Sequence, residues 1–79
     1  MPKPIEQNGK KNLISENLKT LRKEHGLSQR KLAHKLQLIG CDMDKNVITR
    51  IETGKRYVTD IEIKALSRVF GVSYERLID

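Results

Sequence analysis

The sequence is poor in the residues that form cross-links, metal sites and catalytic centres. It has one cysteine, Cys41, and two histidines, so it cannot form an intramolecular disulfide and lacks the paired ligands of a zinc site. No serine or cysteine has a histidine and an acidic residue at a recognisable catalytic spacing, and no glycine-rich loop could hold a phosphate group. The sequence therefore indicates a protein that is not an enzyme and that uses no metal or cofactor.

Long apolar runs are also absent, and no signal peptide is recognisable. A single cysteine is typical of a reducing compartment, so we expect a cytoplasmic protein that does not enter a membrane. The first residues of the chain contain both prolines and almost no large apolar side chain. We expect residues 1–11 to form a disordered basic and polar tail, and residues 12–79 to form one small domain.

Basic residues are concentrated in the first half of the chain. The net charge is +6, and the stretch from Lys10 to Lys35 carries all of it, with eight basic residues against two acidic ones. A basic half attracts polyanions, and nucleic acid is the partner expected for a small domain. A lysine-rich surface that is only solvated is the alternative, so charge supports a nucleic-acid role without deciding it.

Apolar residues recur at helical spacing in five segments, with polar residues at their starts and glycines after several of them. The expected helices run from the N-cap Asn12 to His25, from the N-cap Ser28 to Ile39, from Lys45 after the N-cap Asp44 to Thr53, from Thr59 to Phe70 and from the N-cap Ser73 to Ile78. The apolar positions of the second helix are Leu32, Ala33, Leu36 and Ile39, and Thr59 and Glu62 form a capping box at the start of the fourth. In the fourth helix we expect a buried stripe of Ile61, Ala65, Leu66 and Val69, flanked by Ile63 and Phe70. No strand pattern competes, so the predicted fold is an all-α, compact five-helix domain.

Three short motifs occur in an order and spacing that together are typical of one family. They are Leu27-Ser28-Gln29, then Ile48-x-x-Ile51-Glu52-x-Gly54-Lys55, then Phe70-Gly71-Val72-Ser73. On these residues the chain resembles the Cro/phage-repressor (XRE-like) type of helix-turn-helix protein over Asn12 to Asp79. The resemblance implies that the second and third helices form the DNA-binding unit, with Lys45 to Thr53 as the recognition helix in the major groove.

The resemblance also implies which side chains meet double-stranded DNA. Lys45, Asn46 and Arg50 match positions that contact base edges. Lysine and arginine suit guanine and asparagine suits adenine. Thr49 lies one residue off that row, within reach of a thymine methyl group or a phosphate. For each of these side chains, simple solvation is the competing interpretation.

Phosphate contacts are expected at both ends of the predicted unit. Arg30 and Lys31 lie in the first turn of the second helix, where a bound anion would offset their unfavourable interaction with the helix dipole. Gln29 matches a family glutamine that braces both a phosphate and the recognition helix. Lys55 and Arg56 follow the third helix, where family members bind the DNA backbone.

The family pattern often pairs an arginine and a glutamate at two further positions, here Arg22 and Glu52. We expect a partly buried ion pair between them that ties the first helix to the end of the recognition helix. One departure from the pattern is an apparent insertion of about five residues, Gln37 to Cys41, before the third helix. It could lengthen the second helix by a turn and change the angle at which Lys45 and Asn46 face DNA.

The favoured function is a sequence-specific, repressor-type transcriptional regulator at the nucleoid. It is expected to bind as a homodimer, with a surface near Phe70, Tyr74, Leu77 and Ile78. The alternative is a protein-interaction module, such as an antitoxin or a regulatory subunit, in which Tyr57, Tyr74 and Ile78 contact a protein partner. Alanine at Lys45 and Asn46 would abolish DNA recognition and spare a protein partner.

Overall fold

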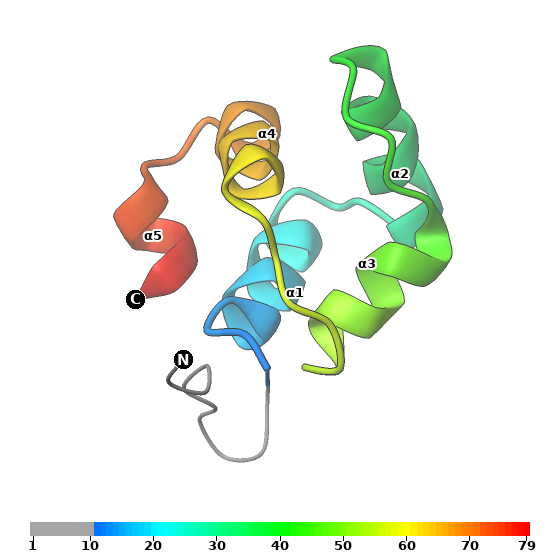
Figure 1. The fold of residues 1–79 in the computed structure, drawn as a ribbon. Coiled ribbons are helices and arrows are strands. Elements are labelled where there is room, and N and C mark those ends of the chain that lie inside the picture. The colour runs from blue at the N-terminus through cyan, green and yellow to red at the C-terminus, as the bar shows by residue number, and fades with distance from the viewer. Residues whose placement is uncertain (1–10) are drawn as a thin grey trace.

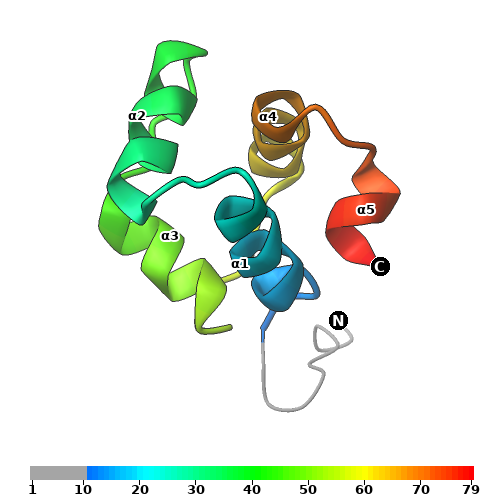
Figure 2. The same ribbon diagram turned by 180° about the vertical axis from the view of Figure 1, so that it is seen from behind.

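The computed structural model describes residues 11–79, and this part of the chain is all-helical. Its helices are α1 (Ser15–Glu24), α2 (Gln29–Leu38), α3 (Lys45–Glu52), α4 (Asp60–Phe70) and α5 (Tyr74–Ile78). The five-helix, all-α prediction is therefore confirmed. Figure 1 and Figure 2 show α5 on one side of α1 and α4, and the α2–α3 pair on the other.

Polar caps begin four of the helices, because their side chains replace hydrogen-bond partners that the first backbone amides lack. In each of these helices the side chain of the cap residue accepts a hydrogen bond from the backbone amide three residues later. The caps of α2, α3, α4 and α5 are, in order, Ser28, Asp44, Thr59 and Ser73. The α4 cap is a full capping box in which Glu62 reaches back to the amide of Thr59. Gly71 ends α4 at φ 65°, a left-handed conformation that favours glycine.

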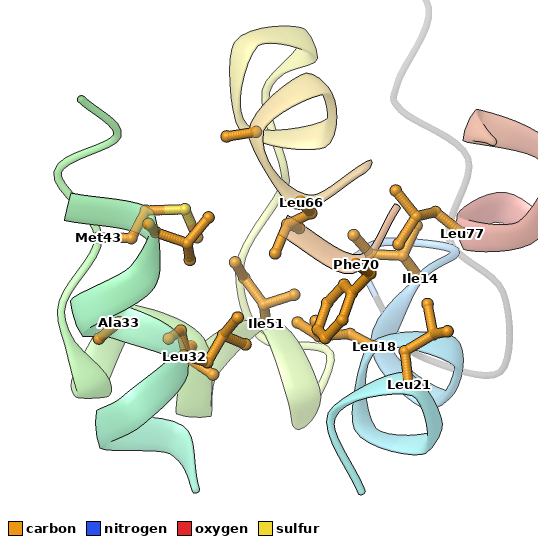
Figure 3. Close-up of a cluster of buried hydrophobic side chains, with 13 residues drawn as sticks. Ile14, Leu18, Leu21, Leu32, Ala33, Met43, Ile51, Leu66, Phe70 and Leu77 are labelled. Atoms are coloured by element: carbon orange, nitrogen blue, oxygen red, sulfur yellow. The ribbon is translucent and has the colours of Figure 1, made fainter. Parts of the chain in front are cut away.

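The core lies where the four longer helices meet, with α5 closing one end through Leu77. Figure 3 shows this cluster. Its largest fully buried side chains are Ile14, Leu18, Leu21, Leu32, Leu36, Met43, Ile48, Ile51, Leu66 and Leu77. Each of these side chains stabilises the fold by roughly 1.5–3 kcal/mol on burial. The core therefore fixes the position of α3 through Ile48 and Ile51.

Three details of the predicted helices are wrong. Ile61 is 73% exposed whereas Phe70 is 5% exposed, because α4 buries the face centred on Leu66 and Ile61 lies about 140° around the helix from it. Ile39 is 42% exposed at the C-cap of α2, where the chain turns away before the side chain can reach the core.

Asn12 does not cap α1. The helix begins at Ser15 after Ile14, with no side-chain hydrogen bond at its cap. Asn12 instead turns the chain, since its Oδ1 accepts from the amide of Ile14. Of the predicted tail, Lys11 is held against the domain because its amide donates to the Gly54 carbonyl over 2.8 Å. The rest of the tail prediction falls on residues 1–10, outside the described residues.

Candidate nucleic-acid interface

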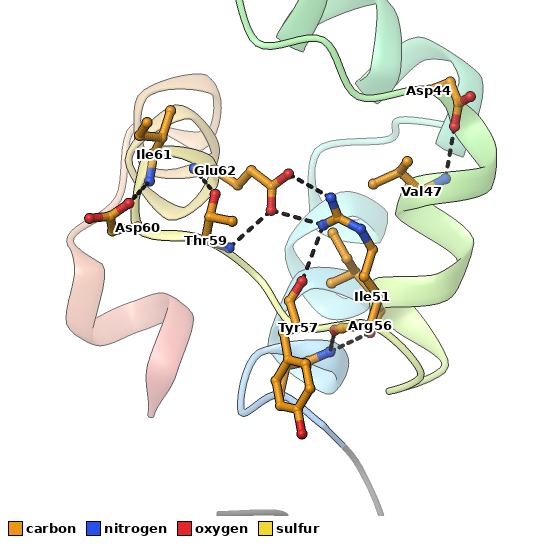
Figure 4. Close-up of polar contacts among 10 residues, drawn as sticks. Asp44, Val47, Ile51, Arg56, Tyr57, Thr59, Asp60, Ile61 and Glu62 are labelled. Carbon is orange, nitrogen blue, oxygen red and sulfur yellow. Dashed lines mark hydrogen bonds and ion pairs between the residues drawn. The ribbon is translucent and has the colours of Figure 1, made fainter. Parts of the chain in front are cut away.

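The helix α3 exposes three of the predicted base-contacting residues. Asp44 caps it by accepting from the amide of Val47 over 2.8 Å, as Figure 4 shows. Lys45, Asn46 and Arg50 are exposed, and within residues 11–79 none of their side chains forms a hydrogen bond or ion pair. The opposite face of α3 is buried. The helix thus offers polar groups whose hydrogen-bonding capacity is not used inside the domain.

These polar residues occupy two rows rather than one. Lys45 lies in an open groove of 560 Å³ beside the start of α2, lined also by Arg22, Ser28, Gln29 and Arg30. Asn46 and Arg50 line a second groove of 420 Å³ along α3. The grooves are joined by Thr49, which lies in the second groove and bonds to Gln29. An extended ligand could therefore contact both rows at once.

A chain of hydrogen bonds fixes α3 to α1 and α2. Arg22 donates twice to the carboxylate of Glu52, from Nε to Oε2 over 2.6 Å and from Nη2 to Oε1 over 3.1 Å. The same Oε1 accepts from Gln29 Nε2 over 3.0 Å, and Gln29 Oε1 lies 2.9 Å from the donating hydroxyl of Thr49. The expected ion pair is present, and Gln29 extends it onto the outer surface of α3.

This network is shielded from water. Glu52 is 3% exposed and Arg22 is 14% exposed, and Arg22 Nη1 also donates to the Leu27 carbonyl. A buried carboxylate is tolerated only when such partners compensate for lost hydration. The network consequently fixes the orientation of α3, on which the positions of Lys45, Asn46 and Arg50 depend.

The predicted phosphate-binding residues are not equivalent. Arg30 and Lys31 are exposed in the first turn of α2, which contains no acidic residue, and Lys55 is exposed after α3. Arg56, by contrast, donates from Nη1 and Nη2 to the two carboxylate oxygens of Glu62, over 2.8 and 2.9 Å. Figure 4 shows this pair beside the first turn of α4.

The Arg56–Glu62 pair has a structural role of its own. The hydrogen bond from Arg56 lowers the pKa of Glu62, opposing the effect of partial burial, and a hydrogen bond from Thr59 adds to the lowering. The carboxylate is therefore held ionised within the capping box. Because the guanidinium is occupied in this way, the structure does not favour the predicted phosphate contact of Arg56.

Sequence reasoning gave two residues near the interface no tertiary role. The Asn12 side chain donates to the Ile51 carbonyl over 3.2 Å and to the Arg56 carbonyl over 2.8 Å. It thereby joins the entry of α1 to both ends of the turn after α3. The sequence predicts Glu62 as part of the capping box, but it does not predict the ion pair of Glu62 with Arg56. No sequence motif marks either contact, because Asn12 lies 39 and 44 residues from its partners and Arg56 lies six residues before Glu62, outside the helix that Glu62 belongs to.

In the structure the predicted insertion spans the last turn of α2 and the turn that follows it. Gln37 and Leu38 belong to the last turn of α2, and Gly40 makes the following turn with φ 86°. Met43 then fills a core position at 1% exposure. No residue from 37 to 43 lines either groove at α3, so the insertion leaves the exposed face of the helix uncovered.

Residues 11–79 contain no group of three or more His, Cys, Asp or Glu side chains placed to hold a metal ion. No helix in this range combines the length and apolar character needed to cross a bilayer.

A model of the helix-turn-helix family (HTH_3) matches residues 18–77, well over half of the chain. The chain belongs to this helix-turn-helix family. The match covers all of α2 and α3, and it supports a DNA-binding regulator rather than an enzyme. No curated protein and no solved structure matches the chain. Proteins of this family bind double-stranded DNA.

Proposed function

We propose that this helix-turn-helix protein is a sequence-specific transcriptional repressor that reads the major groove with α3. The observation that carries the proposal is the uncovered face of α3, where Lys45, Asn46 and Arg50 have no partner within residues 11–79. Polar side chains that need no partner inside the domain can contact base edges without breaking the fold. A repressor mode is the simplest for a small domain, because occupying a control site is enough to block transcription.

In this proposal the two rows on α3 divide the contacts. Asn46 and Arg50 contact base edges, asparagine with adenine and arginine with guanine. Lys45 reaches a guanine or a phosphate from the groove beside α2. Thr49, whose hydroxyl is engaged by Gln29, offers its methyl group to thymine.

Backbone phosphates would be bound by Gln29, Arg30, Lys31 and Lys55. Gln29 uses one amide hydrogen on Glu52 and keeps a second for a phosphate oxygen. The amides at the start of α2 and the absence of acidic residues in its first turn add a favourable field for an anion. Such contacts position the protein but carry little sequence information.

A homodimer is proposed because one α3 contacts too few bases for specificity. Phe70 and Leu77 are buried and cannot form its interface, whereas Tyr74 and Ile78 are 51% and 40% exposed. These two line a 430 Å³ apolar groove between α4 and α5, the α4–α5 groove, together with Asp60, Ile61, Ile63 and Lys64. A two-fold axis there could place Asp60 of one copy near Lys64 of the other.

The decisive experiment selects bound duplexes from a random pool and measures the mass of the complex on the selected duplex. We expect an inverted repeat with half-sites about 10 bp apart and two chains on it. Lys45→Ala with Asn46→Ala should weaken binding to that duplex on the order of 100-fold. Arg68→Ala, an exposed cation on α4 outside both grooves at α3, is the matched control and should leave the affinity unchanged.

Salt dependence gives a second test of the phosphate contacts. The logarithm of the binding constant should fall with the logarithm of salt concentration, with a slope of about −0.9 for each neutralised phosphate. Lys55→Ala should make that slope shallower by about one, and Arg68→Ala should not change it. Binding that does not respond to salt would contradict the proposal.

A protein-interaction module remains the competing function, since Tyr57 is 43% exposed alongside Tyr74 and Ile78. The Lys45 and Asn46 double variant separates the two functions. If a duplex is never selected, or if the double variant binds its duplex as tightly as the parent, the DNA-reading role of α3 is wrong.

A further inference from the structure

The surface between the end of α2 and α4 carries an apolar groove that the DNA-binding face does not use. One hollow of 230 Å³ is lined by Lys35, Leu38, Ile39 and Val69. An adjoining hollow of 180 Å³ shares Ile39 and adds Cys41, Ile61, Lys64, Ala65 and Arg68 among its lining residues. We call the two together the α2–α4 groove. Figure 1 and Figure 2 both show the last turn of α2 beside α4.

Large apolar side chains stand out of this groove into solvent. Leu38 is 72% exposed, Ile39 is 42% exposed and Ile61 is 73% exposed. Single exposed apolar residues are ordinary, but a cluster of them at one groove is typical of a contact surface. Leu38 and Ile39 lie in the segment predicted to be an insertion, and they line the α2 side of the groove.

The rim of the α2–α4 groove is positively charged. Lys35, Lys64 and Arg68 are exposed, and no hydrogen bond or ion pair joins their side chains to other residues in 11–79. Burial raises the pKa of Cys41, and the charges of the nearby carboxylates Glu62 and Asp42 raise it further. Glu62 is paired with Arg56, so its charge is offset within the domain.

We infer that the α2–α4 groove binds an acidic protein segment with an apolar face, such as an amphipathic helix of a partner protein. The hollows are smaller than the pockets that enclose small molecules, but a ridge of aliphatic side chains on a helix fits such a groove. Acidic residues beside that ridge would pair with Lys35 and Arg68, the two rim cations that do not line the α4–α5 groove.

Charge argues against a second copy as the occupant. A two-fold contact centred on this groove would bring the same three cations of each copy together, and the chain as a whole carries +6. The α4–α5 groove, by contrast, contains both Asp60 and Lys64. The two grooves therefore suit different occupants, although they share the ridge of Ile61 and Lys64.

The test uses two synthetic amphipathic helices with leucines at positions i, i+3, i+4 and i+7. One peptide carries glutamates beside the leucines and the other carries lysines in the same places. In amide NMR spectra of the full chain, the acidic peptide should shift Leu38, Ile39 and Arg68, with or without a DNA duplex present. The basic peptide should not bind.

Two charge-matched variants locate the binding surface. Lys35→Glu with Arg68→Glu should weaken binding of the acidic peptide about tenfold, because two surface attractions become repulsions. Lys45→Glu with Arg50→Glu changes the net charge equally on the DNA-binding face, and should leave peptide binding unchanged. Leu38→Ser should also weaken binding of the acidic peptide, since it removes an apolar contact at an exposed site and leaves the net charge unchanged.

Three results would overturn the inference. The first is equal binding of the two peptides, which would show that charge does not select the occupant. The second is a shift pattern centred on α3 that DNA abolishes, which would show that the acidic peptide only imitates DNA. The third is protection of Leu38 and Ile39 in a dimer without peptide, which would show that a second copy covers the groove.

Discussion

Two arginine–glutamate pairs flank α3, and they differ mainly in their contact with water. Arg22 and Glu52 are 14% and 3% exposed, whereas Arg56 and Glu62 are 32% and 13% exposed. Both pairs form two charge-assisted hydrogen bonds, so their chemistry is the same. Arg22–Glu52, which we call the inner pair, joins α3 to α1. Arg56–Glu62, the outer pair, joins the linker after α3 to the first turn of α4. Their burial should make them unequal in energy.

The largest effect is expected when the inner pair is broken. Glu52→Gln leaves Arg22 charged, largely shielded from water and without its ionic partner, so we expect the free energy of unfolding to fall by about 3 kcal/mol or more. Chemical denaturation followed by circular dichroism measures this. Glu62→Gln changes the charge identically in the outer pair and is the control. If the two variants unfold at the same denaturant concentration, burial does not distinguish the pairs.

Asn12 contacts the backbone beside both pairs. Its side chain donates to the carbonyl of Ile51, which precedes Glu52, and to the carbonyl of Arg56. Asn12→Ala removes both bonds and leaves two carbonyl groups to find other partners. We expect a loss of about 2 kcal/mol in unfolding free energy, from the range of about 1–3 kcal/mol for unsatisfied polar groups. Asn46→Ala, at an exposed asparagine without a partner in residues 11–79, should cost far less. Equal losses would mean that the Asn12 bonds add nothing to stability.

The sequence predicts the Arg22–Glu52 pair better than the Arg56–Glu62 pair. Helix caps are local, since the cap and its amide lie three residues apart, so Ser28, Asp44, Thr59 and Ser73 are all identified from sequence. The Arg22–Glu52 pair is also expected, because it lies within motifs shared by the family. The phosphate contact of Arg56 stays a prediction. Its pairing with Glu62 was not predicted, because that pairing has no local signal and a basic residue after a recognition helix resembles a phosphate ligand.

The errors at the core have a similar physical origin. Helical periodicity gives the angle of each side chain around an axis, but the choice of buried face depends on where neighbouring helices lie. In α4 the periodicity predicts a stripe that includes Ile61, but the contacts with α2 and α5 select the face with Phe70 instead. For the insertion, composition could not say whether Leu38 and Ile39 would be buried, since that depends on the reach of the loop.

The smallest effect is expected for the outer pair, and it should depend on pH. Glu62→Gln removes an ion pair that is partly open to water and weakens the capping box, so we expect a loss of about 1 kcal/mol at neutral pH. The pKa of Glu62 is lowered in the folded state, chiefly by the hydrogen bond from Arg56. The contribution of this group is therefore complete above the ordinary pKa of a glutamate, and it is lost as the pH falls through the lowered value. The stability of the parent and of Glu62→Gln should converge in acid and differ by a constant amount above it. If the difference persists at a pH below the lowered pKa, the effect comes from packing, and the outer pair contributes nothing through its charge.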